Sequence, residues 1–196
     1  MLIHNKLTKP NWLLFLTLFL GSFIFCGASN AEQKQTVFSS IDGGFIDLAE
    51  WTGQPYLVVN TASRCAFTKQ YAGLQELYDR YREHGFKVLA VPSDDFNQEL
   101  DTEAEVKDFC ELNYGLDMPM TTLQAVKGAN SHQFYQNLKA TTGFVPSWNF
   151  NKVLIGSDGQ VVNTWGETSR PLSNSIIQAI EKQLFLVESQ LAEDLP

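Results

Sequence analysis

Cys65 is the residue whose type and position in the chain most directly predict chemistry. An apolar, β-branched stretch, residues 57–59, indicates a buried strand, and a polar turn leads from it to the cysteine. A helical pattern follows, with apolar and aromatic residues three and four positions apart over 71–81. We therefore expect Cys65 close to a helix N-terminus, where backbone amides and the helix dipole favour a thiolate.

The cysteine spacing favours a single attacking sulfur over a local dithiol. Thr68 occupies the position at which a Cys-x-x-Cys pair would carry its second cysteine. Cys110 is the one other cysteine outside the N-terminal segment discussed below. In an oxidising compartment the same two residues could instead form a structural disulfide, and composition alone leaves both interpretations open.

Two further segments carry hydrogen-bonding side chains that could serve this sulfur. Gln98 lies in a polar loop directly after a second apolar strand, residues 86–92. Loops at the carboxyl ends of parallel strands gather at one edge of a sheet, so we expect Gln98 near Cys65. Trp148 and Asn149 place an indole N–H beside a carboxamide just before a predicted hairpin.

The elements that must position these residues follow the order hairpin, strand, helix, strand, helix, helix, hairpin, helix. This order predicts an α/β, thioredoxin-like fold: a central mixed β-sheet flanked by helices, with an N-terminal β-hairpin. The tail after about Glu188 is expected to fray. The expected ranges are 36–48 for the first hairpin, 56–60, 67–83, 86–92, 101–112, 131–140, 153–162 for the second hairpin, and 172–187.

The chain is expected to have a leader and one domain. Residues 1–31 combine two lysines, an apolar stretch of about 14 residues and a small-residue end, which is typical of a cleaved signal peptide. Residues 32–196 would then be a single exported domain, periplasmic or secreted. A retained membrane anchor is the alternative, disfavoured because about 20 residues are needed to span a bilayer. A lipid-modified Cys26 is disfavoured by the bulky residues before it.

Charge and composition exclude several classes of partner. Removing the leader takes away two of the 14 Lys and Arg and none of the 22 Asp and Glu, which leaves a net charge of −10. Such acidity argues against binding nucleic acid or anionic membranes. The three histidines show no metal-ligand spacing and no phosphate-binding loop is present, so we expect no metal and no organic cofactor.

Three motifs together give a family resemblance. The segments 59–68 (VNTASRCAFT), 92–99 (PSDDFNQE) and 148–150 (WNF) resemble, in order, the signatures of the glutathione peroxidase family, and the resemblance covers roughly residues 35–185. Ala66 replaces a usual glycine, and the loop before Gln98 is about one residue shorter. Asp94 and Asp95 replace a more usual Asn-containing pair, and we expect them to form a solvated turn.

The resemblance implies a thiol-dependent peroxidase acting on hydrogen peroxide or organic and lipid hydroperoxides. Cys65 would be the peroxidatic cysteine, and Gln98, Trp148 and Asn149 its hydrogen-bonding partners. Cys110 would be either a resolving cysteine or a buried, inert residue. The reductant would be glutathione or a thioredoxin-like protein. The short segment between Lys127 and Trp148 resembles that of family members that are monomers or loose dimers.

Two other functions remain consistent with the sequence. A redox sensor or disulfide carrier would also oxidise at Cys65 but would pass the oxidation to a partner protein. A non-catalytic binding protein of thioredoxin fold would instead hold a structural Cys65–Cys110 bridge.

Overall fold

Two neighbouring parallel strands of the main sheet end at the same edge of that sheet. In the computed structural model, which describes residues 37–193, β3 (Tyr56–Thr61) pairs with β4 (Lys87–Pro92), with Thr61 opposite Pro92. β5 (Lys152–Ile155) and β6 (Val161–Trp165) extend the sheet antiparallel, in the order β4-β3-β5-β6. The predicted leader, residues 1–31, and Cys26 lie outside the described residues.

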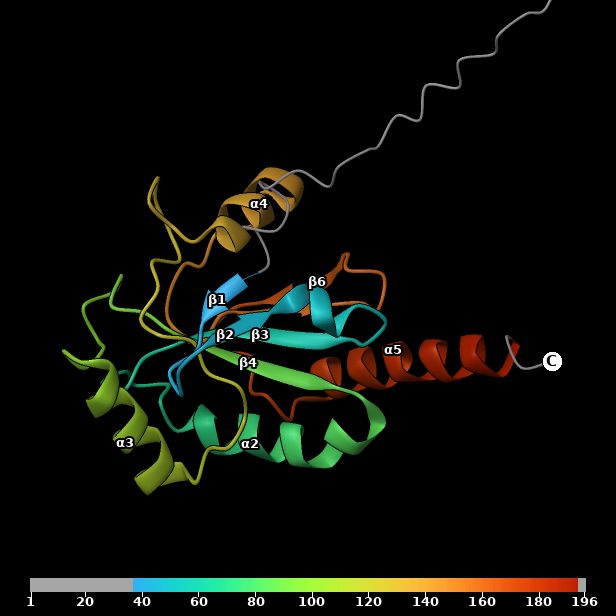
Figure 1. Ribbon diagram of the computed structural model, residues 1–196, viewed down its shortest axis with the longest axis horizontal. Coiled ribbons are helices and arrows are strands. Elements are labelled where there is room, and N and C mark those ends of the chain that lie inside the picture. Colours follow the sequence, from blue (N-terminus) through green and yellow to red (C-terminus); the bar gives the residue numbers. More distant parts are fainter. Residues whose placement is uncertain (1–36, 194–196) are drawn as a thin grey trace, which may run out of the picture.

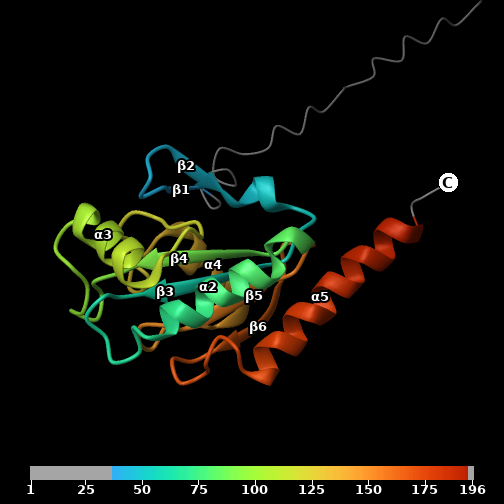
Figure 2. The same cartoon turned by 90° about the horizontal axis from the view of Figure 1, so that it is seen from below.

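β3, β4 and β5 are buried on both faces of the sheet, whereas β6 is partly exposed. Successive side chains of a strand point to opposite sides, so each buried strand contributes to two cores. Leu57 and Val59 belong to a core shared with α2 and α5, whereas Val58 packs into a second core with α4 and the N-terminal hairpin. Figures 1 and 2 show α2 and α5 side by side on one face and α4 on the other. The mixed sheet with helices on both faces and a separate N-terminal hairpin confirms the predicted fold class.

The helices and the hairpin agree with the sequence pattern, with differences at their ends. Thr102 caps the N-terminus of α3 and forms a capping box with Glu105. The hairpin strands are β1 (Val37–Ser39) and β2 (Phe45–Asp47). The α-helices are α2 (Gln70–Tyr81), α3 (Glu103–Tyr114), α4 (Gln133–Thr142) and α5 (Asn174–Glu193), and the short 3-10 helices are η1 (Leu48–Trp51) and η2 (Arg82–His84).

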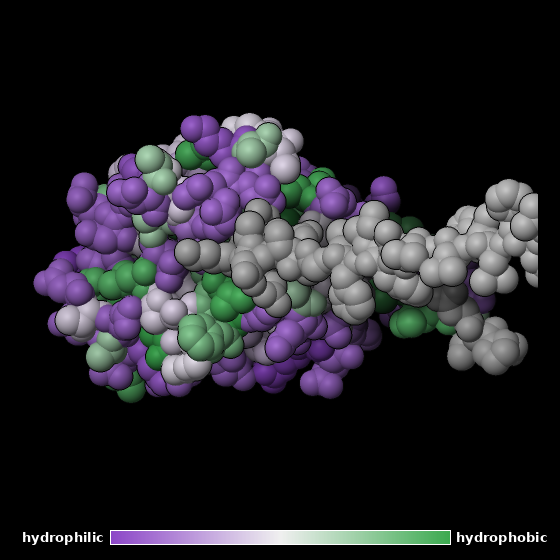
Figure 3. Space-filling model, turned by 45° about the horizontal axis from the view of Figure 1, so that its top comes forward, coloured by the Kyte–Doolittle hydropathy of each residue, from purple (hydrophilic) through white to green (hydrophobic). Residues whose placement is uncertain are grey.

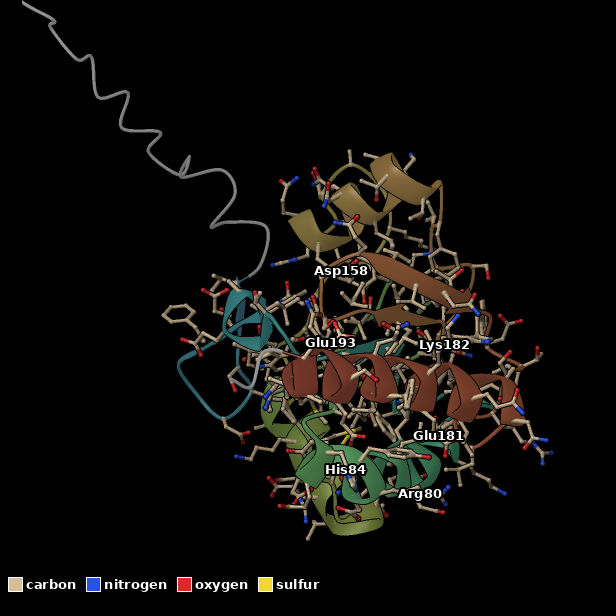
Figure 4. The ribbon with its side chains drawn as sticks, turned by 90° about the vertical axis from the view of Figure 1, so that its right-hand side faces the viewer. Arg80, His84, Asp158, Glu181, Lys182 and Glu193 are labelled. Atoms are coloured by element: carbon tan, nitrogen blue, oxygen red, sulfur yellow. The ribbon has the colours of Figure 1, made fainter. Side chains whose placement is uncertain are left out.

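The C-terminal helix is longer than the sequence pattern predicted. The expectation of a frayed tail after about Glu188 is wrong, since α5 continues to Glu193. Its first half supplies the buried residues Ile176, Ile180 and Leu184, and the hydroxyl of Tyr81 in α2 donates to Glu181 at 2.9 Å. Figure 4 shows α5 lying along α2, with Glu181 on the same side as Arg80. Packing of the first half therefore holds a helix whose last turns are exposed.

The face of the molecule drawn in Figure 3 is mainly polar. On the face drawn in Figure 3, outside the part that grey atoms cover, hydrophilic residues predominate and hydrophobic residues form small, separate patches. Within residues 37–193, none of the helices combines the length and the apolar character that a membrane span requires.

Candidate functional site

Cys65 lies in the loop that joins β3 to α2, with a short, specific hydrogen-bond pattern around it. Its thiol is free and the residue is 8% exposed. The main-chain N–H of Phe67 donates to Sγ at 3.4 Å. Thr68 fixes the loop: its Oγ1 accepts from the amide of Cys65 at 3.0 Å and lies 2.7 Å from the Cys65 carbonyl oxygen. The sulfur is therefore held in place by its own loop, close to the surface.

The expected start of the helix at Phe67 is wrong, because α2 begins at Gln70. The intervening residues form tight turns closed by hydrogen bonds between residues three positions apart. The amide of Thr68 donates to the carbonyl of Cys65 at 3.1 Å, and that of Gln70 donates to the carbonyl of Phe67 at 2.8 Å. Thr68 holds the Cys65 carbonyl from both its amide and its hydroxyl, which favours the tighter turn over an α-helical bond. The donor that reaches the sulfur is consequently a turn amide, not one of the first amides of the helix.

The β3–α2 and β4–α3 loops meet as predicted. The amide of Arg64, next to Cys65, donates to the main-chain carbonyl of Gln98 at 2.8 Å. Both loops leave the carboxyl ends of parallel strands, and the contact follows from that topology. The placement of Gln98 beside the Cys65 loop is therefore confirmed, while its catalytic role remains a prediction.

Asn149, in the loop that leads into β5, joins Gln98 at the same edge of the sheet. Its Nδ2 donates to Oε1 of Gln98 at 3.1 Å, and the residue is fully buried. Its Oδ1 is also buried and has no hydrogen-bond partner in the described part of the chain. A buried acceptor without a partner costs free energy, which suggests that a ligand hydroxyl or water completes this site.

Trp148 lies at the rim of the cluster. Its indole packs against the ring of Phe96, with centroids 5.3 Å apart, and 37% of the residue is exposed. Asn60, inside β3, fixes the Trp148 turn by donating from Nδ2 to the carbonyl of Trp148 at 2.9 Å. The backbone of Phe150 has a φ of 64°, a left-handed conformation that such a residue adopts only where neighbours hold it.

Lys152 is one of those neighbours, and the sequence did not point to it. Its side chain is buried, and Nζ donates to the carbonyl of Phe150 at 2.6 Å and to Oε1 of Gln70 at 2.7 Å. Burial lowers the pKa of this ammonium to about 7, against an opposing effect of Glu167. A lysine at the start of a short apolar strand gave no local signal of this role.

Glu99 holds the backbone of the Cys65 loop by hydrogen bonds, and the sequence did not point to it either. Its Oε1 accepts from the amides of Ser63 and Leu100, both at 2.9 Å, while Oε2 is buried with no partner within residues 37–193. Burial raises the pKa of this carboxyl above its ordinary value, although the Ser63 and Leu100 donors oppose the shift. The only available signal was its position next to Gln98 in the resembling motif.

The expectation of a solvated turn at Asp94 and Asp95 is wrong for Asp95. Its Oδ2 accepts from the amides of Val126 at 2.6 Å and Lys127 at 2.9 Å, which ties the β4–α3 loop to a distant segment. Asp94 is exposed and accepts from the amide of Glu99 at 3.0 Å. The two carboxylates therefore serve as acceptors for backbone amides.

Cys110 is a buried residue of α3 in this structure. It is 1% exposed, and burial raises the pKa of its thiol to about 12. It belongs to the same hydrophobic core as Cys65, yet both thiols are free. The structure therefore contradicts the structural Cys65–Cys110 bridge of the binding-protein alternative, while a resolving role for Cys110 stays a prediction.

His132 has a structural role in capping a helix. It is half-buried, and its Nδ1 accepts from the amide of Phe134 at 3.2 Å and so caps α4. Over residues 37–193 there is no group of three or more His, Cys, Asp or Glu arranged to hold a metal ion.

Comparison with known proteins identifies one family. The model of the family described as glutathione peroxidase matches residues 34–139. A hydroperoxy fatty acid reductase of Synechocystis is 36% identical over 169 residues, which cover 79% of this chain and 99% of that protein. A glutathione peroxidase-like peroxiredoxin of Schizosaccharomyces pombe is 39% identical over 142 residues, covering 69% and 90% of the two chains.

Solved structures agree on the fold. The crystal structure of T. cruzi GPX1 has a TM-score of 0.57 and 29% identity, covering 78% of this chain and 94% of that one. A thiol:disulfide interchange protein of the thioredoxin family from Chlorobium tepidum has a TM-score of 0.59 and 14% identity, covering 76% and 92% of the two chains. The second likeness concerns the fold alone, and it confirms the thioredoxin-like architecture.

Proposed function

We propose, because this chain belongs to the glutathione peroxidase family, that it reduces hydrogen peroxide and organic hydroperoxides with Cys65 as the attacking sulfur. The protein is a thiol-dependent peroxidase, an oxidoreductase. One observation supports the assignment of the site above all. Gln98 and Asn149, from distant segments, are hydrogen-bonded to each other at 3.1 Å, and the backbone of Gln98 is bonded to Arg64 beside Cys65.

In the first step the Cys65 thiolate attacks the nearer peroxide oxygen. An S–O bond forms, the O–O bond breaks, sulfur loses two electrons and the departing oxygen takes a proton to leave as water or an alcohol. The product on the enzyme is a sulfenic acid. Uncharged donors from Gln98, Trp148 and Asn149 would stabilise the thiolate and the charge that develops on the departing oxygen. The unpartnered Oδ1 of Asn149 could accept the hydroperoxide O–H.

Two thiols then return the sulfenic acid to the thiol. The first displaces water and forms a disulfide with Cys65, and the second reduces that disulfide. Glutathione could supply both thiols. Alternatively, Cys110 supplies the first and a thioredoxin-like protein reduces the resulting bridge. The name of the S. pombe relative, a peroxiredoxin, supports considering the second route.

The proposed substrates include organic hydroperoxides because of the similarity to the Synechocystis protein. Its name describes a reductase of hydroperoxy fatty acids, and it is matched over 99% of its length. The protein is further proposed to be exported, periplasmic or secreted, from the leader pattern of residues 1–31, and to be a monomer or loose dimer. The N-terminal sequence of the mature protein and its mass in solution test these two points.

The decisive experiment replaces the sulfur. Cys65→Ser is expected to abolish steady-state consumption of peroxide with glutathione or a thioredoxin system, while circular dichroism stays unchanged. Cys110→Ser is the matched control, since it removes the other described thiol and should keep turnover with glutathione. Peroxide consumption that survives in Cys65→Ser would reject the mechanism. Oxidation of Cys65 without sustained turnover would favour the redox-sensor alternative.

A further inference from the structure

A groove of about 1100 Å³ opens beside the Cys65 loop. One wall begins at Ala66 and Phe67 and continues along the first turn of α2. The other wall is the segment from Thr168 to Ser175, which leads into α5. The groove begins at the residue after Cys65, and Phe67, whose amide donates to the sulfur at 3.4 Å, also lines it.

The charge of this groove is opposite to that of the whole protein. The chain has 22 acidic and 14 basic residues, yet no Asp or Glu lines the groove. Lys69 and Arg170 do, one from each wall, and both are exposed. Neither cation forms an ion pair with any residue of the described range 37–193. Glu167, just outside the lining, instead accepts from Asn151 at 3.4 Å.

The remaining lining is mixed in a way that suits an apolar chain with an acidic end. Phe67, Pro171 and Leu172 offer apolar surface, and serine and threonine hydroxyls lie beside Arg170. Lys69 follows Cys65 by four residues, so the two Cα atoms are at most about 14 Å apart. A carboxylate within a fatty acyl chain's length of a hydroperoxide group can therefore reach this cation.

We propose that this groove binds the carboxylate of a free hydroperoxy fatty acid through Lys69 and Arg170, so that the enzyme prefers the free acid to its ester. The inference rests on the proposed peroxidase function and names the substrate class of the same site. The carboxylate takes no part in the redox step, and only its position relative to Cys65 matters.

The expected preference is modest, because both cations are exposed to water. Exposed ion pairs contribute little each, and two of them correspond to about a five-fold difference in kcat/KM between acid and ester. Because surface charges are screened, the preference should shrink when the salt concentration is raised from about 10 mM to 500 mM.

The test compares the hydroperoxide of linoleic acid with that of its methyl ester, both below the concentration at which they aggregate. The wild-type enzyme should favour the acid about five-fold at low salt. The double variant Lys69→Gln/Arg170→Gln should bring the acid-to-ester ratio of kcat/KM to about one. The charge-retaining variant Lys69→Arg/Arg170→Lys should keep the preference.

A matched control removes two other exposed cations. Lys139→Gln/Lys182→Gln makes the same change in net charge outside the groove, on α4 and on the exposed side of α5 (Figure 4). This control should keep the wild-type acid-to-ester ratio. Because the readout is a ratio within each variant, a general loss of active protein does not alter it.

Several outcomes would overturn the inference. Equal kcat/KM for acid and ester in the wild type would do so, as would an equal loss of preference in the control. A higher KM for glutathione in the groove variant, with an unchanged acid-to-ester ratio, would assign the groove to the reductant instead. If the wild type turned over no peroxide at all, hydrogen peroxide included, the proposed function itself would fall, and this inference with it.

Discussion

The carboxamide of Asn149 donates to Oε1 of Gln98 at 3.1 Å and joins two residues 51 positions apart. This bond uses the acceptor of Gln98 and leaves its Nε2 donor available. It also orients Gln98 from a fully buried partner, so the side chain loses little entropy when it serves the reaction. The best test therefore replaces the Nε2 donor of Gln98 and keeps the oxygen that accepts from Asn149.

Gln98→Glu keeps an acceptor for Asn149 but replaces the donor with a negative charge near the sulfur. We expect the rate of Cys65 oxidation by hydrogen peroxide to fall at least about ten-fold, since a lost oxyanion donor costs about 10²–10³ in other enzymes. Rapid quenching with a thiol reagent followed by mass spectrometry measures the rate. Gln160→Glu, at an exposed position, is the control for charge. A rate equal to that of the control would contradict a role for the Gln98 donor.

Cys110→Ser should separate the two routes of recycling. We expect turnover with a thioredoxin system to be lost and turnover with glutathione to remain, because only the first route needs an internal second thiol. In the reduced protein, iodoacetamide should label Cys65 faster than Cys110, whose burial raises the pKa of its thiol to about 12. Equal losses with both reductants would exclude a specific resolving role.

Glu99 gives a prediction for stability and its dependence on pH. Glu99→Ala should lower the free energy of unfolding by about 1–3 kcal/mol, because the buried amide of Ser63 loses its acceptor. Since burial raises the pKa of Glu99, the folded state holds the proton more tightly than the unfolded state. The folded wild-type protein is therefore most stable below the pKa that Glu99 has in the unfolded chain. It loses stability as the pH rises through the higher pKa that Glu99 has in the folded state.

Glu99→Gln removes this titration and keeps an acceptor. Urea unfolding at pH 4 and pH 7 should show the variant gaining stability relative to wild type at the higher pH. A difference that is constant between the two values would contradict a raised pKa of the Glu99 carboxyl.

Lys152 should make stability depend on pH with the opposite sign, and at alkaline pH. Burial lowers the pKa of its ammonium to about 7. Below that pH the lysine is charged in the folded state, and the full cost of burying the charge lowers the stability. As pH rises from about 7 towards the unfolded value of about 10.4, the wild type should gain up to about 1.4 kcal/mol per pH unit relative to Lys152→Met. Denaturant unfolding at pH 7 and pH 9 measures this slope.

Lys182→Met, at an exposed position of α5, is the matched control and should run parallel to the wild type. A Lys152→Met variant that also runs parallel would show that the ammonium titrates normally. Lower peroxidase activity of Lys152→Met would further indicate that its bond to the Phe150 carbonyl positions the Trp148 turn.

Local sequence patterns predicted most helices and strands, because an element that buries one or both faces carries apolar residues at a regular spacing. The apolar run 56–60 differs from β3 by one residue, and the capping residues before Glu103 mark the start of α3. The patterns failed where a side chain competed with the helix: Thr68 holds the Cys65 carbonyl in a tight turn and delays α2 to Gln70. They also failed at the end of α5, where packing of the first half holds an exposed continuation.

The sequence by itself determined that Cys65 follows a buried strand, that Gln98 follows its parallel neighbour, and that three motifs in order resemble a peroxidase family. These features are local, so periodicity and spacing express them. Only the tertiary structure decided that Asn149 bonds Gln98, that Glu99 and Lys152 are buried beneath the site, that Cys110 is sealed in α3, and that a cationic groove opens beside Cys65. Each of these depends on contacts between residues far apart in the chain, and no short stretch of sequence specifies which distant groups will meet.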